Sequence, residues 1–365
     1  MVNADTTTKL YSAIHSQPDA VRELLTDWKS PELAAEKLAR SGRILLAGIG
    51  TSFHAAIVGE YLFRLAGIEA WALRSFEFVS YPRSLHIDDG MIIISHRGSK
   101  LQSTLALQRA IDAHVSIVGI TGKNSQMQGA DIIVTTVEQD PSPAHSISYI
   151  GALTRLAQIA ARVATLLGRH ENAQRLEHGL SLLPTLMENI LAREEEIRAV
   201  AQEAAAHQRR IYYVGAGPNA PTAPEGALKA KEAAYVTAEG FELEQAIHGP
   251  MTAFEAEDLI VPVSVVGPAQ PRLADFLLAQ SEIGSHVFLL GEAPSVETAA
   301  LFQRPGWMQF ALGNRTDLLE ELTPLLAVIP VQLMANFLAA ARSINPDSFR
   351  LDQEDYKRAS TRFRL

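Results

Sequence analysis

Three charged residues between positions 225 and 232 have the spacing and chemistry of a proton-transfer site. Glu225, Lys229 and Glu232 are separated by four and then three positions, which places them on one face of a helix. A carboxylate there can take and return a proton, and a neighbouring ammonium can stabilise negative charge that develops on a substrate. The spacing alone favours a simpler interpretation, an exposed ladder of Glu and Lys side chains.

The residues around this pattern add a second candidate. The stretch from 225 to 250, EGALKAKEAAYVTAEGFELEQAIHGP, is rich in alanine at first, which predicts a slim helix that can pack tightly. It closes with His248-Gly249-Pro250, after three glutamates. A lone histidine in a loop is more often structural than catalytic.

Glycines and hydroxyls at positions 48–54 have the composition of a phosphate-binding turn. Gly48 and Gly50 let the backbone approach an anion, Thr51 and Ser52 offer hydroxyls, and the following helix offers free N–H groups. Residues 215–219, Gly-Ala-Gly-Pro-Asn, form a similar turn later in the chain. A Gly-x-Gly turn is equally typical of a tight connection between a strand and a helix.

A second candidate phosphate loop follows an apolar run at positions 95–100. Ser95 and Ser99 supply hydroxyls, His96 an imidazole, and Arg97 and Lys100 two cations. The cations could also point into solvent.

A nicotinamide cofactor is a minor alternative. The sequence GAGPNA fits the Gly-x-Gly-x-x-Gly/Ala pattern of dinucleotide sites, but GIGTSF lacks the third small residue and no acidic residue clearly ends a second strand. We therefore expect no cofactor. The chain has no cysteine, which excludes a thiolate nucleophile and a Cys-ligated zinc, and we expect no metal site.

The elements that must position these residues repeat along the chain. RILLAGIG (43–50) matches RIYYVGAG (210–217), an offset of 210 − 43 = 167 positions. Three later apolar runs also correspond: 88–98 with 257–267, 114–122 with 286–294, and 130–136 with 307–313. Apolar runs that alternate with helix-like stretches, such as 101–113 and 272–283, predict parallel strands with helices on both faces. The fold class is therefore α/β, with two tandem doubly wound parallel sheets.

Five regions follow from this pattern. They are a helical segment (1–40), a first sheet domain (41–165), a helical connector (166–206), a second sheet domain (207–345) and a polar tail (346–365).

Charge and hydropathy limit the partners and the location. A net charge of −9 argues against nucleic acid as the main partner. The N-terminus does not show the basic segment followed by an apolar segment that is typical of a signal peptide. We therefore predict no signal peptide and a cytoplasmic location. The most apolar stretch, 322–341, contains two prolines, Gln332 and Asn336, which suits a buried helix better than a membrane span.

Several segments of the sequence resemble a known family. The 225–250 stretch resembles a signature in the second sugar-isomerase (SIS) domain of glutamine–fructose-6-phosphate transaminase. GIGTSFHAA (48–56) resembles the start of its first SIS domain, and SHRGSK (95–100) stands where that family has Ser-Gln-Ser-Gly-Glu-Thr. Residues 144–157 and 329–347 resemble later helices, so the likeness covers about 40–350.

The resemblance implies roles for these residues. Glu232 would be the base that moves a proton between C1 and C2 of an open-chain sugar phosphate, with Lys229 stabilising the charge that develops. Glu225 would bind substrate or hold Lys229. His248 would assist ring opening from the partner subunit, which implies a homodimer with a shared active site. Ser52, Ser95, His96 and Ser146 would hold the phosphate. The candidate substrate-binding residues of the same loops also include Gly50, Thr51, Arg97, Ser99 and Lys100.

The sequence departs from the family at three places. The glutaminase domain, which needs an N-terminal cysteine, is not in this sequence, so we expect this chain not to draw ammonia from glutamine by itself. The loop at 95–100 carries Arg97 and Lys100, which could strengthen phosphate binding or reach a second anionic group. The family's Schiff-base lysine near the C-terminus has only Lys357 as a counterpart, about three residues out of register.

We therefore expect an amino-sugar-phosphate isomerase or deaminase that acts on glucosamine 6-phosphate and fructose 6-phosphate. A fructosamine-6-phosphate deglycase and a plain aldose–ketose isomerase are close alternatives, because pocket loops rather than the fold decide among them. An alternative of another class is a sugar-phosphate sensor without turnover, and a weaker one is an interaction module with a degenerate site.

Overall fold

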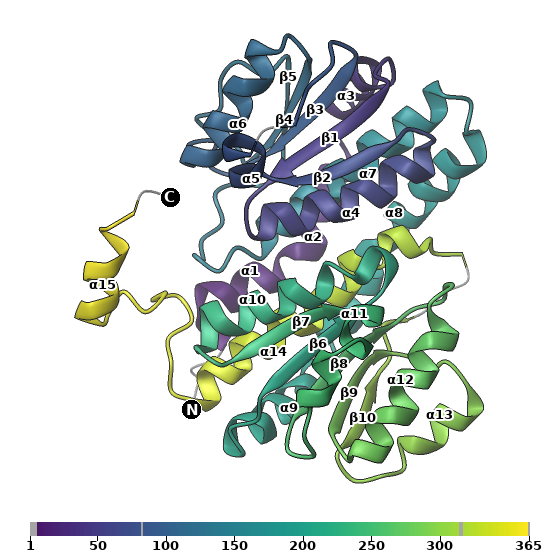
Figure 1. Cartoon of the computed structure of the whole chain (residues 1–365), viewed down its shortest axis with the longest axis vertical. Coiled ribbons are helices and arrows are strands. Elements are labelled where there is room, and N and C mark those ends of the chain that lie inside the picture. Colours follow the sequence, from purple (N-terminus) through teal and green to yellow (C-terminus); the bar gives the residue numbers. More distant parts are fainter. Residues whose placement is uncertain (1–5, 82, 314–316, 364–365) are drawn as a thin grey trace. The chain divides into compact units, whose positions relative to one another are not determined.

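The structure, a computed structural model, describes residues 6–81, 83–313 and 317–363. The chain divides into two compact units, each built on one five-stranded parallel sheet (Figure 1). The first-sheet unit comprises Ser16–Pro184 and Ser348–Leu365, and the second-sheet unit comprises Met1–His15 and Thr185–Asp347. Each unit therefore combines two segments that are far apart in the sequence.

The first sheet has the strand order β2-β1-β3-β4-β5 with all pairs parallel. In that order its strands span Ala70–Arg74, Arg43–Gly48, Asp89–Ile94, Ser116–Thr121 and Ile132–Thr135. The chain passes from β1 to β2 and then returns to β3 on the other side of β1. The strand order therefore reverses between β1 and β3, which is where open α/β sheets bind ligands.

Helices cover both faces of the first sheet because its central strands are apolar on both sides. Leu45 and Met91 face a core under α5 (Ser75–Ser80) and α6 (Leu101–Asp112). Leu46, on the opposite face, lies under Gly59 of α4 (Thr51–Ala66). That helix packs on α7 (Ile147–Leu166), which also contacts α2 (Gln17–Leu25) and α3 (Lys29–Leu38). The unit also contains α15 (Glu354–Ser360) and the first part of α8 (His170–Leu191).

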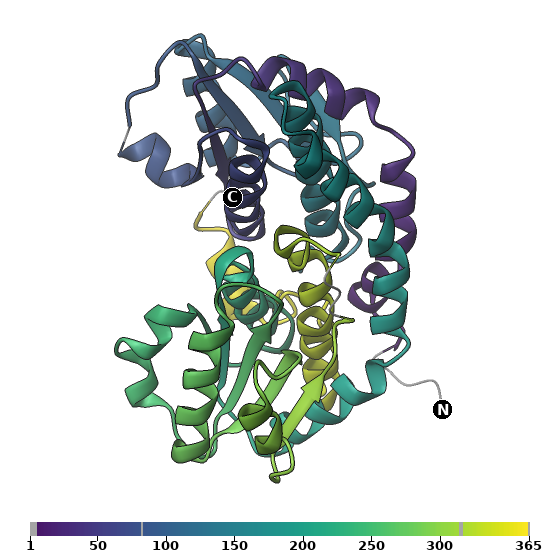
Figure 2. The same ribbon diagram turned by 90° about the vertical axis from the view of Figure 1, so that its right-hand side faces the viewer.

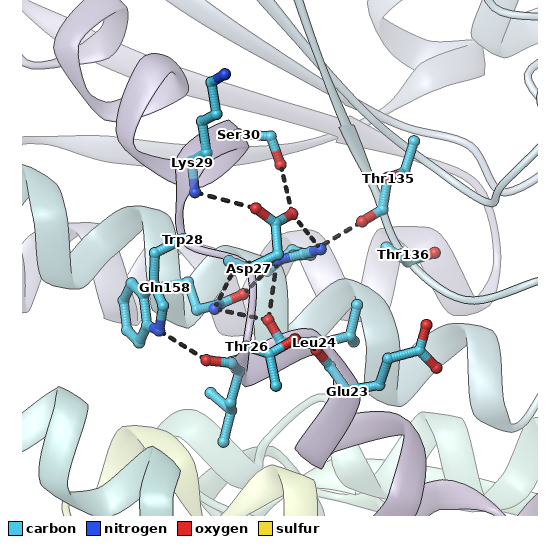
Figure 3. Close-up of polar contacts among 12 residues, drawn as sticks. Glu23, Leu24, Thr26, Asp27, Trp28, Lys29, Ser30, Thr135, Thr136 and Gln158 are labelled. Carbon is cyan, nitrogen blue, oxygen red and sulfur yellow. Dashed lines mark hydrogen bonds and ion pairs between the residues drawn. The ribbon is translucent and has the colours of Figure 1, made fainter.

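A buried arginine fastens the turn between α2 and α3 to the first sheet. The guanidinium of Arg155, 3% exposed, donates to the carbonyl of Asp27 (2.7 Å) and to that of Thr135 at the end of β5 (2.8 Å). It also pairs with the Asp27 carboxylate at 3.0 Å. The amide of Gln158 donates to the carbonyl of Leu24 (3.1 Å), and Figure 3 shows these contacts around Asp27. The network satisfies carbonyl groups that the end of α2 leaves without helical partners.

The second sheet has the equivalent order β10-β9-β8-β6-β7, again all parallel. In that order its strands span Trp307–Phe310, His286–Gly291, Leu259–Ser264, Ile211–Gly215 and Ala238–Glu242. One face is covered by α11 (Leu243–Ile247), α12 (Gln270–Ile283) and α13 (Val296–Leu301). The unit also contains α1 (Lys9–His15), α9 (Glu194–Ala206), α10 (Thr222–Ala234) and α14 (Pro324–Ala341) (Figure 2). Its described residues also form the short 3₁₀ turns η2 (Gly217–Asn219), η3 (Pro250–Ala253) and η4 (Glu320–Leu322).

The predicted fold class is confirmed: the chain has two parallel sheets flanked by helices. All eight predicted strands are present. The edge strands β2 and β7 were not predicted: β7, AEGFE, carries two glutamates and a glycine, and β2, AWALR, is a short apolar run that closely follows α4.

The apolar stretch at 322–341 forms α14, which packs against α9 and α10. The segment Glu320–Ala341 is long and apolar enough to cross a membrane, but 89% of its most apolar window is buried in the structure. Such burial is what the core helix of a globular unit requires, so the predicted core position is confirmed, and the cytoplasmic location stays a prediction.

Candidate active site

Two of the predicted phosphate-binding segments meet at one edge of the first sheet. The turn at Gly50 follows β1, and Ser95–Lys100 follows β3, the strand beside it. The carboxyl ends of parallel strands lie at the same edge, and these two flank the reversal of strand order. The structure therefore brings the two segments together at the position where this kind of sheet binds ligands.

The turn after β1 depends on its two glycines. A Cβ added to Gly48 would overlap the backbone oxygen of Ser52, and Gly50 has a φ of +53°, in the left-handed region. Gly50 is the N-cap of α4, so Thr51 and Ser52, both half-buried, begin the helix. The N–H groups of Ser52 and Phe53 already donate to the carbonyls of Ile49 and Gly50, so the features here that suit an anion are the hydroxyls and the positive end of the helix dipole.

The loop after β3 is held firmly to the loop after β4. Ser95 is buried, and its N–H donates to the carbonyl of Ile120 (3.0 Å). The N–H of Gly122 donates to the carbonyl of His96 (2.9 Å). Nε2 of His96 accepts from the N–H of Asp140 at 3.1 Å, and burial lowers the pKa of this imidazole. His96 is therefore neutral at pH 7, and with the tautomer assigned from this bond its proton is on Nδ1.

The cations of the same loop differ in their surroundings. Arg97 and Ser99 are exposed, whereas Lys100 is half-buried and precedes α6. Burial, followed by the nearby charge of Arg97, lowers the pKa of Lys100. Two positive charges close to each other at a partly buried edge favour a bound anion.

Ser146 lies at the N-cap position of α7, fully buried. Its Oγ has no hydrogen-bond partner within the described part of the chain. The preceding residue, His145, stacks edge-on to His96 with ring centroids 5.9 Å apart. Ser148 donates to the Asp140 carboxylate at 3.0 Å, and this carboxylate therefore anchors the loop that carries Ser146. Asp140, His145 and Ser148 were not predicted as site residues, because only tertiary contacts bring Asp140 and His145 to His96 and connect Ser148 to both of them.

In the second-sheet unit, α10 carries a buried ion triad. Nζ of Lys229 lies 2.7 Å from Oε2 of Glu232 and 3.5 Å from Oε1 of Glu225. The side chains of Glu225 and Lys229 are 0% and 1% exposed, and that of Glu232 is 20% exposed. The alternative of an exposed Glu–Lys ladder is therefore wrong.

Close packing also marks the face of α10 that contacts the second sheet. A Cβ on Gly226 would meet the ring of Tyr213 on β6 at 2.8 Å, and a Cβ on Gly240 of β7 would overlap the backbone of Ala223. The small residues on α10 and β7 thus let helix and sheet approach. In the triad, the Lys229 ammonium lies between the carboxylates of Glu225 and Glu232, and of these two carboxylates only that of Glu232 reaches an accessible surface.

The hydrogen bond of the His248 side chain is made outside this triad. It caps the end of α11 with a side chain that is 69% exposed, and its Nε2 lies 2.7 Å from Oε1 of Glu244. Arg272 of α12 also binds Glu244, at 2.7 Å, and this contact, followed by His248, keeps the pKa of Glu244 low. The structure thus groups His248 with an exposed carboxylate and a guanidinium.

Lys357 lies on α15, whose seven residues include none that is buried. No group of three or more His, Cys, Asp or Glu residues that could hold a metal ion occurs within residues 6–81, 83–313 and 317–363.

Comparison with known proteins places this architecture. Residues 37–166 match the SIS domain. This segment of the chain therefore belongs to the SIS family. It is 31% identical over 351 residues to a glutamine–fructose-6-phosphate aminotransferase (isomerizing) of Gloeobacter violaceus, covering 92% of this chain and 56% of that protein. The chain thus spans about half the length of the curated relatives it matches, and it aligns with their isomerase half.

Solved structures share the fold over nearly the whole chain. The C-terminal domain of glucosamine–fructose-6-phosphate aminotransferase from Francisella tularensis has a TM-score of 0.82 at 21% identity, covering 93% of this chain and 98% of that one. Tagatose-6-phosphate ketose/aldose isomerase from Escherichia coli has a TM-score of 0.78 at 20% identity, covering 95% and 96%. The two sheets therefore correspond to tandem SIS domains.

Proposed function

We propose that the protein is a sugar-phosphate isomerase that acts on amino-sugar phosphates of the glucosamine 6-phosphate and fructose 6-phosphate type. The Lys229 ammonium held between Glu225 and Glu232 carries the proposal. A solvated Glu–Lys ladder needs no burial, whereas a base beside a fixed cation is what proton transfer next to a carbonyl needs. The relatives named as aminotransferases and isomerases support the same substrate class.

In the proposed reaction Glu232 removes a proton from C1 or C2 of the open-chain sugar and returns it to the other of these two carbon atoms. Negative charge gathers on the oxygen or nitrogen substituent during the transfer, and the Lys229 ammonium stabilises it. In the deaminating direction, isomerisation of glucosamine 6-phosphate gives an imine at C2. Water replaces the nitrogen there, ammonia leaves, and fructose 6-phosphate remains.

The phosphate is proposed to bind at the reversal point of the first sheet. Three features support this: the positive N-terminal end of α4, the hydroxyls of Ser52 and Ser95, and the buried Oγ of Ser146, which has no hydrogen-bond partner among the described residues. Lys100 and Arg97 would add positive charge. His96 would act by holding the loop at Asp140, because its neutral ring already accepts a hydrogen bond.

The test is release of ammonia and fructose 6-phosphate from glucosamine 6-phosphate by the purified protein. Glu232→Gln should abolish turnover while sugar-phosphate binding stays within about tenfold. Glu239→Gln, an exposed carboxylate on β7, is the matched control and should stay active. Turnover in Glu232→Gln equal to that of the control would remove Glu232 from the mechanism. If binding is seen without any turnover or proton exchange at C1 and C2, the protein is a sensor.

We further propose that His248 serves the site of a partner subunit in a homodimer. Its high exposure and its position outside the α10 triad support a role beyond its own chain. Mixing the inactive variants Glu232→Gln and His248→Ala would then restore about one quarter of the activity, because random pairing gives half heterodimers with one intact site each. No recovery after subunit exchange, measured by native mass spectrometry, would contradict a shared site.

A further inference from the structure

The reversal point of the second sheet carries a depression that differs in chemistry from that of the first. It lies between the ends of β6 and β8, which pair with each other, and is lined by backbone at Gly215 and Ala216 and by the apolar side chains of Leu243, Val263 and Leu273. The Glu320 side chain of η4 is the only ionisable group among its described lining residues. The equivalent edge of the first sheet carries hydroxyls and cations.

Two glycines make room for this carboxyl group. A Cβ on Gly267, just after β8, would lie 2.5 Å from Oε2 of Glu320, and a Cβ on Gly217 would lie 3.1 Å from Oε1. The turn at Gly217 is itself tied to η4, because Asn219 donates to the hydroxyl of Thr323 at 2.7 Å. The carboxyl group is thus seated against backbone at a defined place.

Nothing within the described residues compensates the charge of Glu320. The Glu320 carboxylate forms no ion pair or hydrogen bond with a described residue. Arg272 of α12, near the depression, forms its ion pairs with Glu244 and Asp275 instead. Among the described residues, the neighbour that acts on it electrostatically is the acidic Glu321. Burial, followed by Glu321, raises the pKa of Glu320 to about 7.

We propose that this depression binds a primary ammonium group carried on a short apolar chain. The ammonium would donate to Glu320, and the chain would extend out of the enclosed space past Ala269, a partly exposed lining residue. The enclosed space holds about one water-sized group, which is the size of an ammonium head. A metal cation is a poorer match, because Mg²⁺ or Ca²⁺ requires six or more oxygen ligands.

This site is separate from the proposed proton-transfer chemistry and has its own readout. Ionised Glu320 is the binding form, so affinity should follow the ionised fraction. With a pKa of about 7, that fraction, and with it the affinity, rises about tenfold between pH 6 and pH 8. An alkylammonium ion stays charged over this range.

The experiment is titration calorimetry of the full chain with n-propylammonium chloride, with tetramethylammonium chloride as a probe of equal charge without N–H donors. The wild type should bind propylammonium about tenfold more tightly at pH 8 than at pH 6 and should bind tetramethylammonium much more weakly. Glu320→Gln should lose at least about tenfold in affinity, whereas Glu321→Gln, the adjacent carboxylate, should retain binding.

Two measurements keep the test independent of the folding of Glu320→Gln. Gly267→Ala keeps the carboxyl group but displaces it, and should weaken propylammonium binding. In the wild type below pH 7, binding should release a proton, seen as a dependence of the measured heat on the buffer. Equal affinity for both ammonium ions, an affinity without pH dependence, or equal losses in Glu320→Gln and Glu321→Gln would each overturn the proposal.

Discussion

Replacing Lys229 by methionine tests the energetics of the buried triad most directly. Methionine keeps most of the side-chain volume but removes the ammonium that lies 3.5 Å from Glu225. The carboxylate of Glu225, 0% exposed, then loses this cation at 3.5 Å. Removing one partner of a buried ion pair is strongly destabilising, because an uncompensated charge stays in the interior.

The magnitude follows from the distance. At 3.5 Å and an effective dielectric constant of about 20, the attraction is on the order of 5 kcal/mol. Measured losses for broken buried pairs are about 3–5 kcal/mol, so we expect Lys229→Met to lower the free energy of unfolding of the second-sheet unit by about that amount. Urea unfolding followed by the fluorescence of Trp307, which is buried in β10, would measure it.

Two further variants decide the interpretation. Lys231→Met removes an exposed ammonium from the same helix and should change stability by no more than about 0.5 kcal/mol. Adding Glu225→Gln to Lys229→Met removes the uncompensated charge and should restore much of the loss. If Lys229→Met is no less stable than Lys231→Met, or if the double variant loses the sum of the single effects, the triad is not electrostatically coupled.

Three other predictions concern the first-sheet unit. Arg155→Met should cost about 2–4 kcal/mol in urea unfolding, because it leaves buried carbonyls and the Asp27 carboxylate without their donor; a loss under about 1 kcal/mol would contradict this. Ser146→Ala should leave stability within about 1 kcal/mol, since its hydroxyl has no hydrogen-bond partner among the described residues, yet weaken sugar-phosphate binding measured by calorimetry; unchanged affinity would remove Ser146 from the phosphate site. Lys357→Ala should prevent borohydride trapping of substrate if Lys357 forms the imine, and an adduct that persists would exclude it.

The sequence predicts the buried strands well because burial on both faces demands continuous apolar residues. RILLAG and LIVPVS show this pattern and form β1 and β8. The edge strands are less constrained, since one side has no strand neighbour, so Trp71 on β2 is exposed and charged residues are tolerated there.

For the candidate site, spacing identifies which residues share a face but not whether that face is buried. The pattern of Glu225, Lys229 and Glu232 would be the same on a solvated helix, and only the burial of the Glu225 and Lys229 side chains in the folded unit distinguishes the two cases. Glu320 could not be found from local sequence. It lies 103 positions after Gly217 (320 − 217), and the fold alone brings its carboxyl group to that turn.

The division of the chain into interleaved segments has a consequence for its synthesis. α1 is made early but belongs to the second-sheet unit, where Thr8 bonds to Asn336 and the N–H of Lys9 to Asp347. At translation rates of about 5–20 residues per second, those partners emerge about 15–70 seconds after α1. The early helix is therefore exposed during elongation and available to chaperones, and a ribosome stalled midway through the chain would leave it without its partners.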